Sequence, residues 1–510
     1  SVRLNPLDAA WLFTESRATP NHVGGLLLFR LLPGAPEDFL SKLMKEFRGH
    51  RAFMAPWNRR LKVPFNKNPL AAWIEDPDID LEYHVRHLAL PRPGGERELG
   101  ELVGLLQSQP LDLSRPAWEC TIIEGLEGGR FGLFVKMHHS LIDGVSGMKL
   151  LQRAMSPDAK KSLAIPPFWA TGLESPSRSE RPMPTMAEAM SGAADALTVQ
   201  LRSVPQLVGA FGKMVRRIGD PQDGMAVPFA SPRSILNGRV REKRRFATQQ
   251  FPMERLRTLA QAAGGTLNDV VLAICGGALR RYLMERDNLP EASLTAGIPV
   301  SVRPQDDEGA GNAITFIVAT LGTDVADPAE RIAAIRSSVR HAKEHVQSLP
   351  RHAMQQYTML LMAPTILTLL TGMGGRTRPM FNITISNVPG PDKPLYFRGA
   401  ELLATYPASI VTHGQALNIT CQSYAGYMNF GYTGCHSSVP SLQKLAVYTG
   451  DALAELEAAL LPAQAIKANK PTKAATKSAK VVALPVVKKA ARSRSATPVA
   501  RKRKTGSADQ

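Results

Sequence analysis

The sequence predicts an α/β protein built from two halves of similar construction. Its 510 residues exceed what one hydrophobic core supports, because chains beyond roughly 250–300 residues divide into domains. Strand-like apolar runs alternate with helical periodicity on both sides of a stretch rich in proline, serine and charge, which is typical of a linker. We therefore predict an N-terminal domain over residues 1–155, a partly helical linker over 156–243, a C-terminal domain over 244–466 and a tail over 467–510.

The N-terminal half contains strand and helix signals in turn. Residues 22–29 form an apolar, strand-like run, and residues 39–47 place apolar side chains at helical spacing. Residues 131–137 are a second apolar run, which we interpret as a buried strand. The chain then turns through Asp143 and Gly144 into a segment with apolar residues at helical spacing, so we predict a strand, a turn and a helix in succession.

Two adjacent histidines, His138 and His139, stand where this strand ends. Side chains alternate on an extended backbone, so the two rings point in opposite directions and at most one faces a given cavity. Such a histidine is either a hydrogen-bonded structural ring or a base held in position. Zinc needs further ligands, and the four cysteines show no CxxC spacing and no nearby histidine cluster. We therefore predict no metal site.

Composition and the first residues predict a compartment. Four unpatterned cysteines in 510 residues indicate a reducing environment without a disulfide framework. Residues 1–13 lack a basic region followed by a long apolar run, so we expect no secretory signal. We therefore expect a cytoplasmic protein and leave association with a membrane surface open. The sequence has no Walker loop, no GxGxxG after a strand and no GxSxG nucleophile elbow.

Two apolar segments each have two interpretations. Residues 190–217, in the predicted linker, show roughly helical spacing interrupted by Pro205 and end in basic residues. A basic amphipathic segment can lie on a membrane, and it can equally pack on its own protein. Residues 357–373 contain no charge but fall short of the roughly 20 residues that span a bilayer. A buried helix is the first interpretation there, and partial membrane insertion is the second.

The second half begins with a strand-like run at 244–251. Thr266 and Asp269 have the spacing of a helix-capping box, which gives Asp269 an architectural role. A helix N-terminus exposes free N–H groups, and Asn268 adds a side-chain donor, so Asn268 either stabilises an oxyanion or serves capping and packing. Arg303, at the end of a strand predicted over 296–303, is a candidate partner for a carboxylate.

The tail differs in kind from the rest of the chain. Residues 467–510 carry 13 lysines and arginines against one aspartate, which leaves only +6 of the chain's net charge of +18 for residues 1–466. Its composition lacks the aromatic residues that nucleate a core, so we expect disorder. Charge of this kind attracts anionic lipid headgroups or nucleic acid without specificity. We therefore expect no specific nucleic-acid partner.

Several motifs together resemble a known family. HHSLIDG at residues 138–144 resembles the HHxxxDG signature of acyl-CoA-dependent acyltransferases related to chloramphenicol acetyltransferase and to peptide-synthetase condensation domains. The flanks, PLDLSRPAWECTIIEGLEGGRF before the strand and SGMKLL after it, resemble the bacterial wax ester synthase/acyl-CoA:diacylglycerol acyltransferase family. Asn268 and Asp269 match the Asn-Asp pair that is the family's second signature. The resemblance covers residues 5–460.

The resemblance implies two chloramphenicol-acetyltransferase-like domains packed to leave a channel, with acyl-CoA and alcohol entering from opposite sides. It implies that His139 is the general base and that His138 supports it. It also implies that Asp143, held by an arginine, orients the site, while Gly144 provides the turn. Acyl-CoA is a co-substrate, so no cofactor is expected. The basic stretch 233–245 is either a contact for CoA phosphates or a solvated face.

The predicted function is transfer of a fatty acyl group from acyl-CoA to a long-chain alcohol, to diacylglycerol, or to both. We expect peripheral contact with membrane or lipid inclusions. One alternative is a transferase of the same superfamily with a carrier-protein or polyketide donor, which assays with CoA-bound and carrier-bound acyl groups separate. A second is a non-catalytic lipid-inclusion protein, in which His139→Ala leaves function intact.

Overall fold

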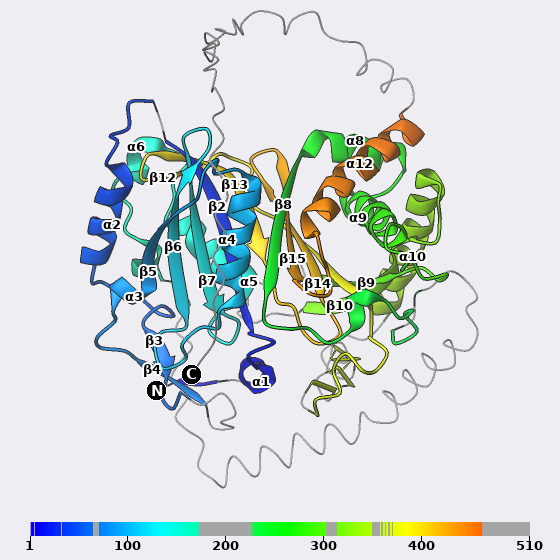
Figure 1. The fold of residues 1–510 in the computed structure, drawn as a ribbon, viewed down its shortest axis with the longest axis horizontal. Coiled ribbons are helices and arrows are strands. Elements are labelled where there is room, and N and C mark those ends of the chain that lie inside the picture. Colours follow the sequence, from blue (N-terminus) through cyan, green and yellow to red (C-terminus); the bar gives the residue numbers. More distant parts are fainter. Residues whose placement is uncertain are drawn as a thin grey trace, which may run out of the picture. The chain divides into compact units, whose positions relative to one another are not determined.

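Two mixed six-stranded β-sheets carry the fold (Figure 1). The computed structural model describes residues 2–4, 6–31, 33–64, 71–172, 228–301, 314–348 and 371–461, with the isolated residues 226, 357, 358, 361, 362, 364, 365, 368 and 369. The tail, the 190–217 segment, Arg303 and six residues of 357–373 lie outside the described residues. The predictions made for those segments therefore stay predictions.

The N-terminal sheet places the predicted histidine strand near its centre. In sheet order its strands are β12 (Tyr396–Phe397), β13 (Ala400–Ala408), β2 (His22–Arg30), β7 (Arg130–His138), β6 (Trp118–Leu126) and β5 (Val85–Ala89). Neighbours pair antiparallel, except β5 and β6, which are parallel. Side chains of β7 alternate between two apolar clusters, with Leu133 and Val135 in one and Phe134 in the other. The sheet is therefore covered on both faces.

The C-terminal sheet has the same number of strands. In sheet order these are β10 (Ile314–Thr320), β9 (Thr295–Ser301), β11 (Ile383–Val388), β14 (Leu417–Tyr424), β15 (Tyr427–Cys435) and β8 (Arg244–Pro252). β11 pairs parallel with β9 and β14, and the other neighbours are antiparallel. A small third sheet joins β1 (Val2–Arg3), β4 (Ala72–Glu75) and β3 (Arg59–Leu61).

Helices flank both large sheets (Figure 1). In chain order they are α1 (Pro6–Thr14), α2 (Phe39–Gly49), α3 (Leu81–His84), α4 (Glu96–Ser108), α5 (Gly144–Arg153), α6 (Ala159–Ser162), α8 (Met253–Ala262), α9 (Leu267–Met284), α10 (Pro328–Gln347) and α12 (Leu442–Leu460), with 3₁₀ turns η1 (Phe168–Ala170) and η2 (Ile235–Asn237). The starts of α5, α9 and α10 follow sequence rules, because Asp143, Thr266 and Asp327 each accept a hydrogen bond from a backbone N–H of the first turn.

The two halves meet along α4 and the edge strand β8 (Figure 1). A Cβ atom on Gly100 would lie 2.7 Å from the carbonyl oxygen of Phe246, and one on Gly104 would lie 2.9 Å from that of Arg244. Only glycine allows this approach of helix to strand. The Ser108 hydroxyl at the end of α4 accepts a hydrogen bond of 2.7 Å from the Arg244 backbone N–H. The helix therefore lies directly against the backbone of the strand, and a serine side chain at its end accepts a hydrogen bond from that backbone.

The strands also cross between the halves. Residues 396–408, which fall within the predicted C-terminal domain, form β12 and β13 of the N-terminal sheet. β13 pairs antiparallel with β2, with Ala408 opposite Gly24. Hydrophobic spacing predicts where a strand lies in the sequence but not which sheet it joins, because pairing across hundreds of residues is decided by packing.

Among the described residues, no single helix combines the length and apolar character that crossing a membrane requires. One pair, α8 and α9, passes a test of length and composition only when joined across its 98° bend.

Candidate active site

His139 lies directly after β7, on the turn that leads into α5. Its backbone N–H donates a hydrogen bond of 2.9 Å to the carbonyl oxygen of Asn21, which precedes β2. The ring of Trp11, from α1, packs against the imidazole with 4.2 Å between ring centroids and 31° between the planes. The imidazole is partly buried, and its Nδ1 has no hydrogen-bond partner among the described residues. Trp11 and Asn21, both far from the motif in the sequence, thus hold this histidine in place.

The surroundings of His139 keep its imidazole neutral. Burial lowers the pKa of His139 to about 4, while the Asp143 carboxylate acts in the opposite direction and His138 adds a smaller lowering. Desolvation disfavours the charged form of a histidine, and a nearby carboxylate favours it. A neutral ring has a free lone pair at neutral pH, and Asp143 stabilises the imidazolium that forms when the ring accepts a proton. The ring is therefore in the form that accepts a proton at neutral pH, and the Asp143 carboxylate restores part of the basicity that burial removes.

His138 has a different environment, and its ring is fully buried. Its Nδ1 accepts a hydrogen bond from the Ser140 backbone N–H at 3.2 Å and lies 2.6 Å from the Ser140 hydroxyl. The proton is therefore on Nε2, which lies 3.2 Å from Oε2 of Glu15. The two rings have separate partners, which agrees with the prediction that they point in opposite directions. His138 thereby links α1 to the turn that carries His139.

Asp143 and Gly144 form the start of α5. The Asp143 carboxylate accepts hydrogen bonds from the Ser146 backbone N–H at 2.9 Å and from the Ser146 hydroxyl at 2.7 Å. This capping role fixes the carboxylate next to His139. The arginine that holds Asp143 stays a prediction, and Arg303, the candidate partner for a carboxylate, lies outside the described residues. A Cβ on Gly144 would meet no atom within 4 Å, so steric crowding does not explain why a glycine stands at this position.

Asn268 and Asp269 lie in the first turn of α9, where the predicted capping box is present. Oδ2 of Asp269 accepts hydrogen bonds from the Thr266 backbone N–H at 2.7 Å and the Thr266 hydroxyl at 2.8 Å. Asp269 is buried, and Asn268 is partly exposed. No hydrogen bond in the described part of the chain joins Asn268 to the histidine pair, so its oxyanion role stays a prediction.

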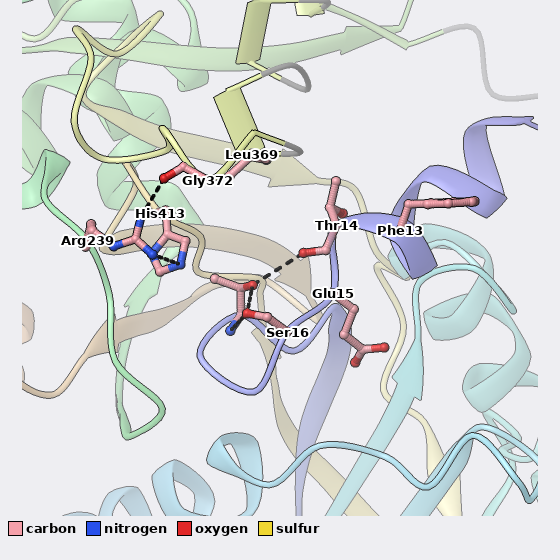
Figure 2. Close-up of a pocket in the computed structure, with 9 residues that line it drawn as sticks. Phe13, Thr14, Glu15, Ser16, Arg239, Leu369, Gly372 and His413 are labelled. Carbon is pink, nitrogen blue, oxygen red and sulfur yellow. Dashed lines mark hydrogen bonds between the residues drawn. The ribbon is translucent and has the colours of Figure 1, made fainter. Parts of the chain in front are cut away.

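Two cavities are lined by neighbours of the histidine pair, Glu15 in one and α5 in the other, although neither His138 nor His139 is among the described residues that line them. The larger, of about 400 Å³, is lined by the end of α1 and the residues after it, including Glu15, and by Arg239 and His413 from the other half. Figure 2 shows Arg239 and His413 on one side of it and Thr14, Ser16 and Glu15 on the other. The smaller, of about 220 Å³, lies between α5 and the turn after β11, so we call it the α5 cavity.

The predicted basic stretch 233–245 does not form one cationic face. Arg244 is buried and donates hydrogen bonds to the carbonyl oxygens of Ala18 at 2.7 Å and Val411 at 3.4 Å. Arg239 donates to the carbonyl oxygens of Gly372 at 2.9 Å and Gly374 at 3.3 Å. These guanidinium groups hold backbone segments together. The contact of this stretch with CoA phosphates stays a prediction.

Sequence reasoning missed Glu15 and Trp11 as neighbours of the histidine pair. Glu15 is 123 positions from His138 in the sequence, and no local pattern marks a carboxylate that far away as its partner. The only signal was that the family resemblance begins at residue 5 and so includes Glu15. No group of three or more histidine, cysteine, aspartate or glutamate side chains is placed to hold a metal ion in the part of the chain that the structure describes.

The fold and the histidine turn together define a class. Two mixed sheets, with the HHxxxDG motif after a central strand and its aspartate capping the next helix, fit the chloramphenicol-acetyltransferase-like acyltransferase that the resemblance implies. The chain matches the model of the wax ester synthase/diacylglycerol acyltransferase catalytic domain over residues 4–271 and that of the WS/DGAT C-terminal domain over residues 310–457. The chain belongs to the wax ester synthase/diacylglycerol acyltransferase family, and it is an acyltransferase.

Individual relatives support this assignment over most of the chain. O-acyltransferase WSD of Acinetobacter baylyi is 38% identical, and the match covers 91% of this chain and 99% of that one. A Mycobacterium tuberculosis protein provisionally named as a diacylglycerol O-acyltransferase is 43% identical over 90% of this chain and 97% of its own. The solved wax ester synthase/diacylglycerol acyltransferase of Marinobacter aquaeolei VT8 is 36% identical with a TM-score of 0.70, covering 89% of this chain and 99% of that one.

A more distant structure confirms the predicted fold class. The first condensation domain of the calcium-dependent antibiotic synthetase is 17% identical, has a TM-score of 0.55 and covers 91% of this chain and 97% of its own. At this identity the likeness concerns the fold alone. The expected two-domain α/β fold of the chloramphenicol-acetyltransferase type is thus confirmed.

Proposed function

We propose that this protein transfers a fatty acyl group from acyl-CoA to the hydroxyl of a long-chain alcohol or of diacylglycerol, with His139 as the general base. The observation that carries the proposal is the neutral imidazole of His139, held after β7 by Trp11 and the Asn21 carbonyl. The names of the family and of its relatives support these substrate classes.

The reaction needs one base and two bound substrates. An alcohol is a weak nucleophile until its proton is removed, and a neutral imidazole accepts that proton as the oxygen attacks the thioester carbonyl carbon. Collapse of the tetrahedral intermediate breaks the C–S bond, and the imidazolium returns the proton to the departing CoA thiolate. Both reactants bind together, so no acyl-enzyme forms and no cofactor takes part. General bases of this kind contribute roughly 10²–10⁴-fold to rate.

Other residues act through the charges that develop during the reaction. Asp143 lies close enough to raise the pKa of His139, so it stabilises the imidazolium in the transition state. His138 holds the turn to α1 through Glu15 and does not itself exchange a proton with substrate. The tetrahedral oxyanion needs hydrogen-bond donors, and we assign this role to Asn268 or to N–H groups at the start of α9.

The test uses purified protein, palmitoyl-CoA and either hexadecanol or dipalmitoylglycerol, with free thiol and lipid product measured together. We expect His139→Ala to lower turnover at least about 100-fold and His138→Ala to lower it less. The matched control is His87→Ala, which removes a histidine paired with Glu124 on β5 and β6. Full turnover by His139→Ala would reject acyl transfer through this ring. Equal losses from His138→Ala and His139→Ala would reject the division of roles.

We also propose that the enzyme works in the cytoplasm, at the surface of membranes or lipid inclusions. Its acyl acceptors partition into lipid, and residues 467–510 carry 13 basic side chains that anionic headgroups attract. Flotation with vesicles of phosphatidylcholine, with and without phosphatidylglycerol, tests the proposal. We expect the full chain to float with the anionic vesicles and the chain lacking 467–510 to float less. Equal recovery of both chains would assign membrane contact to another segment.

A further inference from the structure

The α5 cavity carries an inference that rests on the proposed function. Its walls are one face of α5, at Val145, Met148 and Lys149, the turn 388–391 after β11, and Gln422 of β14. Val145 is only six residues after His139 and lies in the first turn of α5. Sequence periodicity predicts Val145 on the same buried helix face as Met148 and Leu151, but it is 37% exposed. An apolar side chain at this rim is available to a ligand instead of the core.

Gln422 is a buried hydrogen-bond donor at the wall of this cavity. The residue has 0% exposure, and its Oε1 accepts a hydrogen bond of 3.1 Å from the Thr405 hydroxyl. Its Nε2 has no partner among the described residues. Buried polar groups in native proteins are nearly always paired, so a fully buried amide donor without a protein partner needs an explanation. A ligand that carries an acceptor into the cavity supplies one.

The turn after β11 is built to cover Gln422 closely. Val388 is opposite Gln422 in the parallel pairing of β11 and β14. A Cβ on Gly390 would lie 2.1 Å from the carbonyl oxygen of Ser423 and 3.3 Å from Cγ of Gln422. The Gly390 backbone N–H donates a hydrogen bond of 3.0 Å to the Ser423 hydroxyl. The Pro-Gly-Pro turn therefore fixes the position of the glutamine stem.

The chemistry of the walls favours one of the two substrates. Among the described residues, Lys149 is the one charged side chain that lines the α5 cavity, whereas the larger cavity has both the Arg239 guanidinium and the Glu15 carboxylate in its wall. A polyanionic CoA is favoured where a cation is present and a carboxylate is absent. The pantetheine arm of CoA is uncharged and carries two amide carbonyls, which suit apolar walls with one amide donor. Hexadecanol has only its hydroxyl, which His139 engages.

We propose that the α5 cavity holds the pantetheine arm of acyl-CoA and that Nε2 of Gln422 donates a hydrogen bond to one of its amide carbonyls. This assigns acyl-CoA to the side of the histidine turn that faces α5. The acceptor then approaches from the side of the larger cavity. Gln422 is a residue that positions the thioester and recognises the arm, and it takes no part in proton transfer.

The test measures the KM for palmitoyl-CoA with hexadecanol as acceptor, because hexadecanol has no carbonyl. We expect Gln422→Leu, and Gln422→Met if the first variant is unstable, to raise this KM about fivefold to tenfold with little change in kcat. Asn429→Leu is the matched control. Asn429 is also fully buried with an unpartnered amide donor, is opposite Gln422 on β15, and does not line the cavity. The KM of the Asn429→Leu variant for palmitoyl-CoA should equal that of the parent enzyme.

Two further arms make the result specific. Val145→Trp fills the rim of the cavity and should also raise the KM for palmitoyl-CoA. The loss in Gln422→Leu should persist with palmitoyl-pantetheine, which keeps both amides, and disappear with S-ethyl thiohexadecanoate, which has none. An unchanged KM in folded Gln422→Leu, a rise in the KM for hexadecanol instead, or equal loss with the amide-free thioester would overturn the proposal. An inactive Gln422 variant would not bear on the role of His139 as the base. The His139→Ala variant tests that role separately.

Discussion

Shielding of His139 by Trp11 predicts an unusual pH dependence. Burial lowers the pKa of the His139 imidazole to about 4, whereas an unshielded histidine has a pKa near 6.5. At pH 5.5 a ring of the ordinary kind is only about one tenth neutral, whereas a ring with a pKa near 4 is almost entirely neutral. The value of kcat/KM should therefore be nearly level from pH 7.5 to 5.5 and fall only as the pH approaches 4. An unshielded base would lose about tenfold over the same range.

Trp11→Ala removes the ring that packs on the imidazole at 4.2 Å. Water then reaches His139, the desolvation that lowers its pKa weakens, and the pKa rises toward 6.5. We expect the acid limb of kcat/KM to move upward by one to two pH units in this variant. Trp11→Phe keeps an aromatic face over the ring and should keep the limb close to that of the parent enzyme.

The assay follows CoA release from palmitoyl-CoA with a thiol reagent that reacts at acid pH. Each sample is returned to pH 7.5 and assayed again, which separates titration from irreversible unfolding. The folded protein binds the His139 proton less readily than the unfolded chain, so stability also decreases as the pH falls from 6.5 toward 4. An acid limb at pH 6.5 or above in the parent enzyme, or no movement of the limb in Trp11→Ala, would refute the shielding argument.

Three further predictions concern stability and the tail. Lys136→Met should lower the free energy of unfolding by about 3 kcal/mol in urea denaturation, because Lys136 is buried 3.2 Å from Glu119 and its loss removes one partner of that carboxylate. Gly104→Leu should lower it by about 1–3 kcal/mol, because the new side chain meets the β8 backbone, while Gly49→Ala, with open space around it, should not. Deletion of residues 467–510 should leave turnover in detergent unchanged, and an inactive truncation would show that these residues belong to the catalytic fold.

Local patterns predicted the parts of the site that depend on neighbours in the sequence. The apolar run 131–137 lies within β7, and the spacing of Thr266 and Asp269 gives the capping box of α9. Alternation on an extended strand predicted that His138 and His139 have different surroundings. These features are set by backbone geometry over a few residues, so a sequence pattern is sufficient to find them.

Contacts between distant segments could not be predicted in the same way. Nothing near Glu15 indicates that its carboxylate meets His138, and nothing in the run 130–138 indicates that Lys136 pairs with Glu119 beneath the end of α4. Lys136 also donates to the carbonyl oxygen of Leu106 at 3.0 Å, at the end of a helix where a cation is favourable. Periodicity predicts which face of an element is buried, but packing in three dimensions decides what that face meets.

The crossing strand explains why the histidine depends on both halves of the chain. β7, which carries the motif, is separated from β13 only by β2, and β13 comes from residues 400–408. β13 also touches the C-terminal sheet, because a Cβ on Gly431 of β15 would lie 1.9 Å from the carbonyl oxygen of Pro407. The Ser409 backbone N–H, just beyond β13, donates a hydrogen bond of 3.1 Å to the Thr433 hydroxyl. A displacement of the C-terminal sheet therefore reaches the edge of β2, whose first residue is opposite His138, so the geometry around His139 is a property of residues 1–462 as one folded unit.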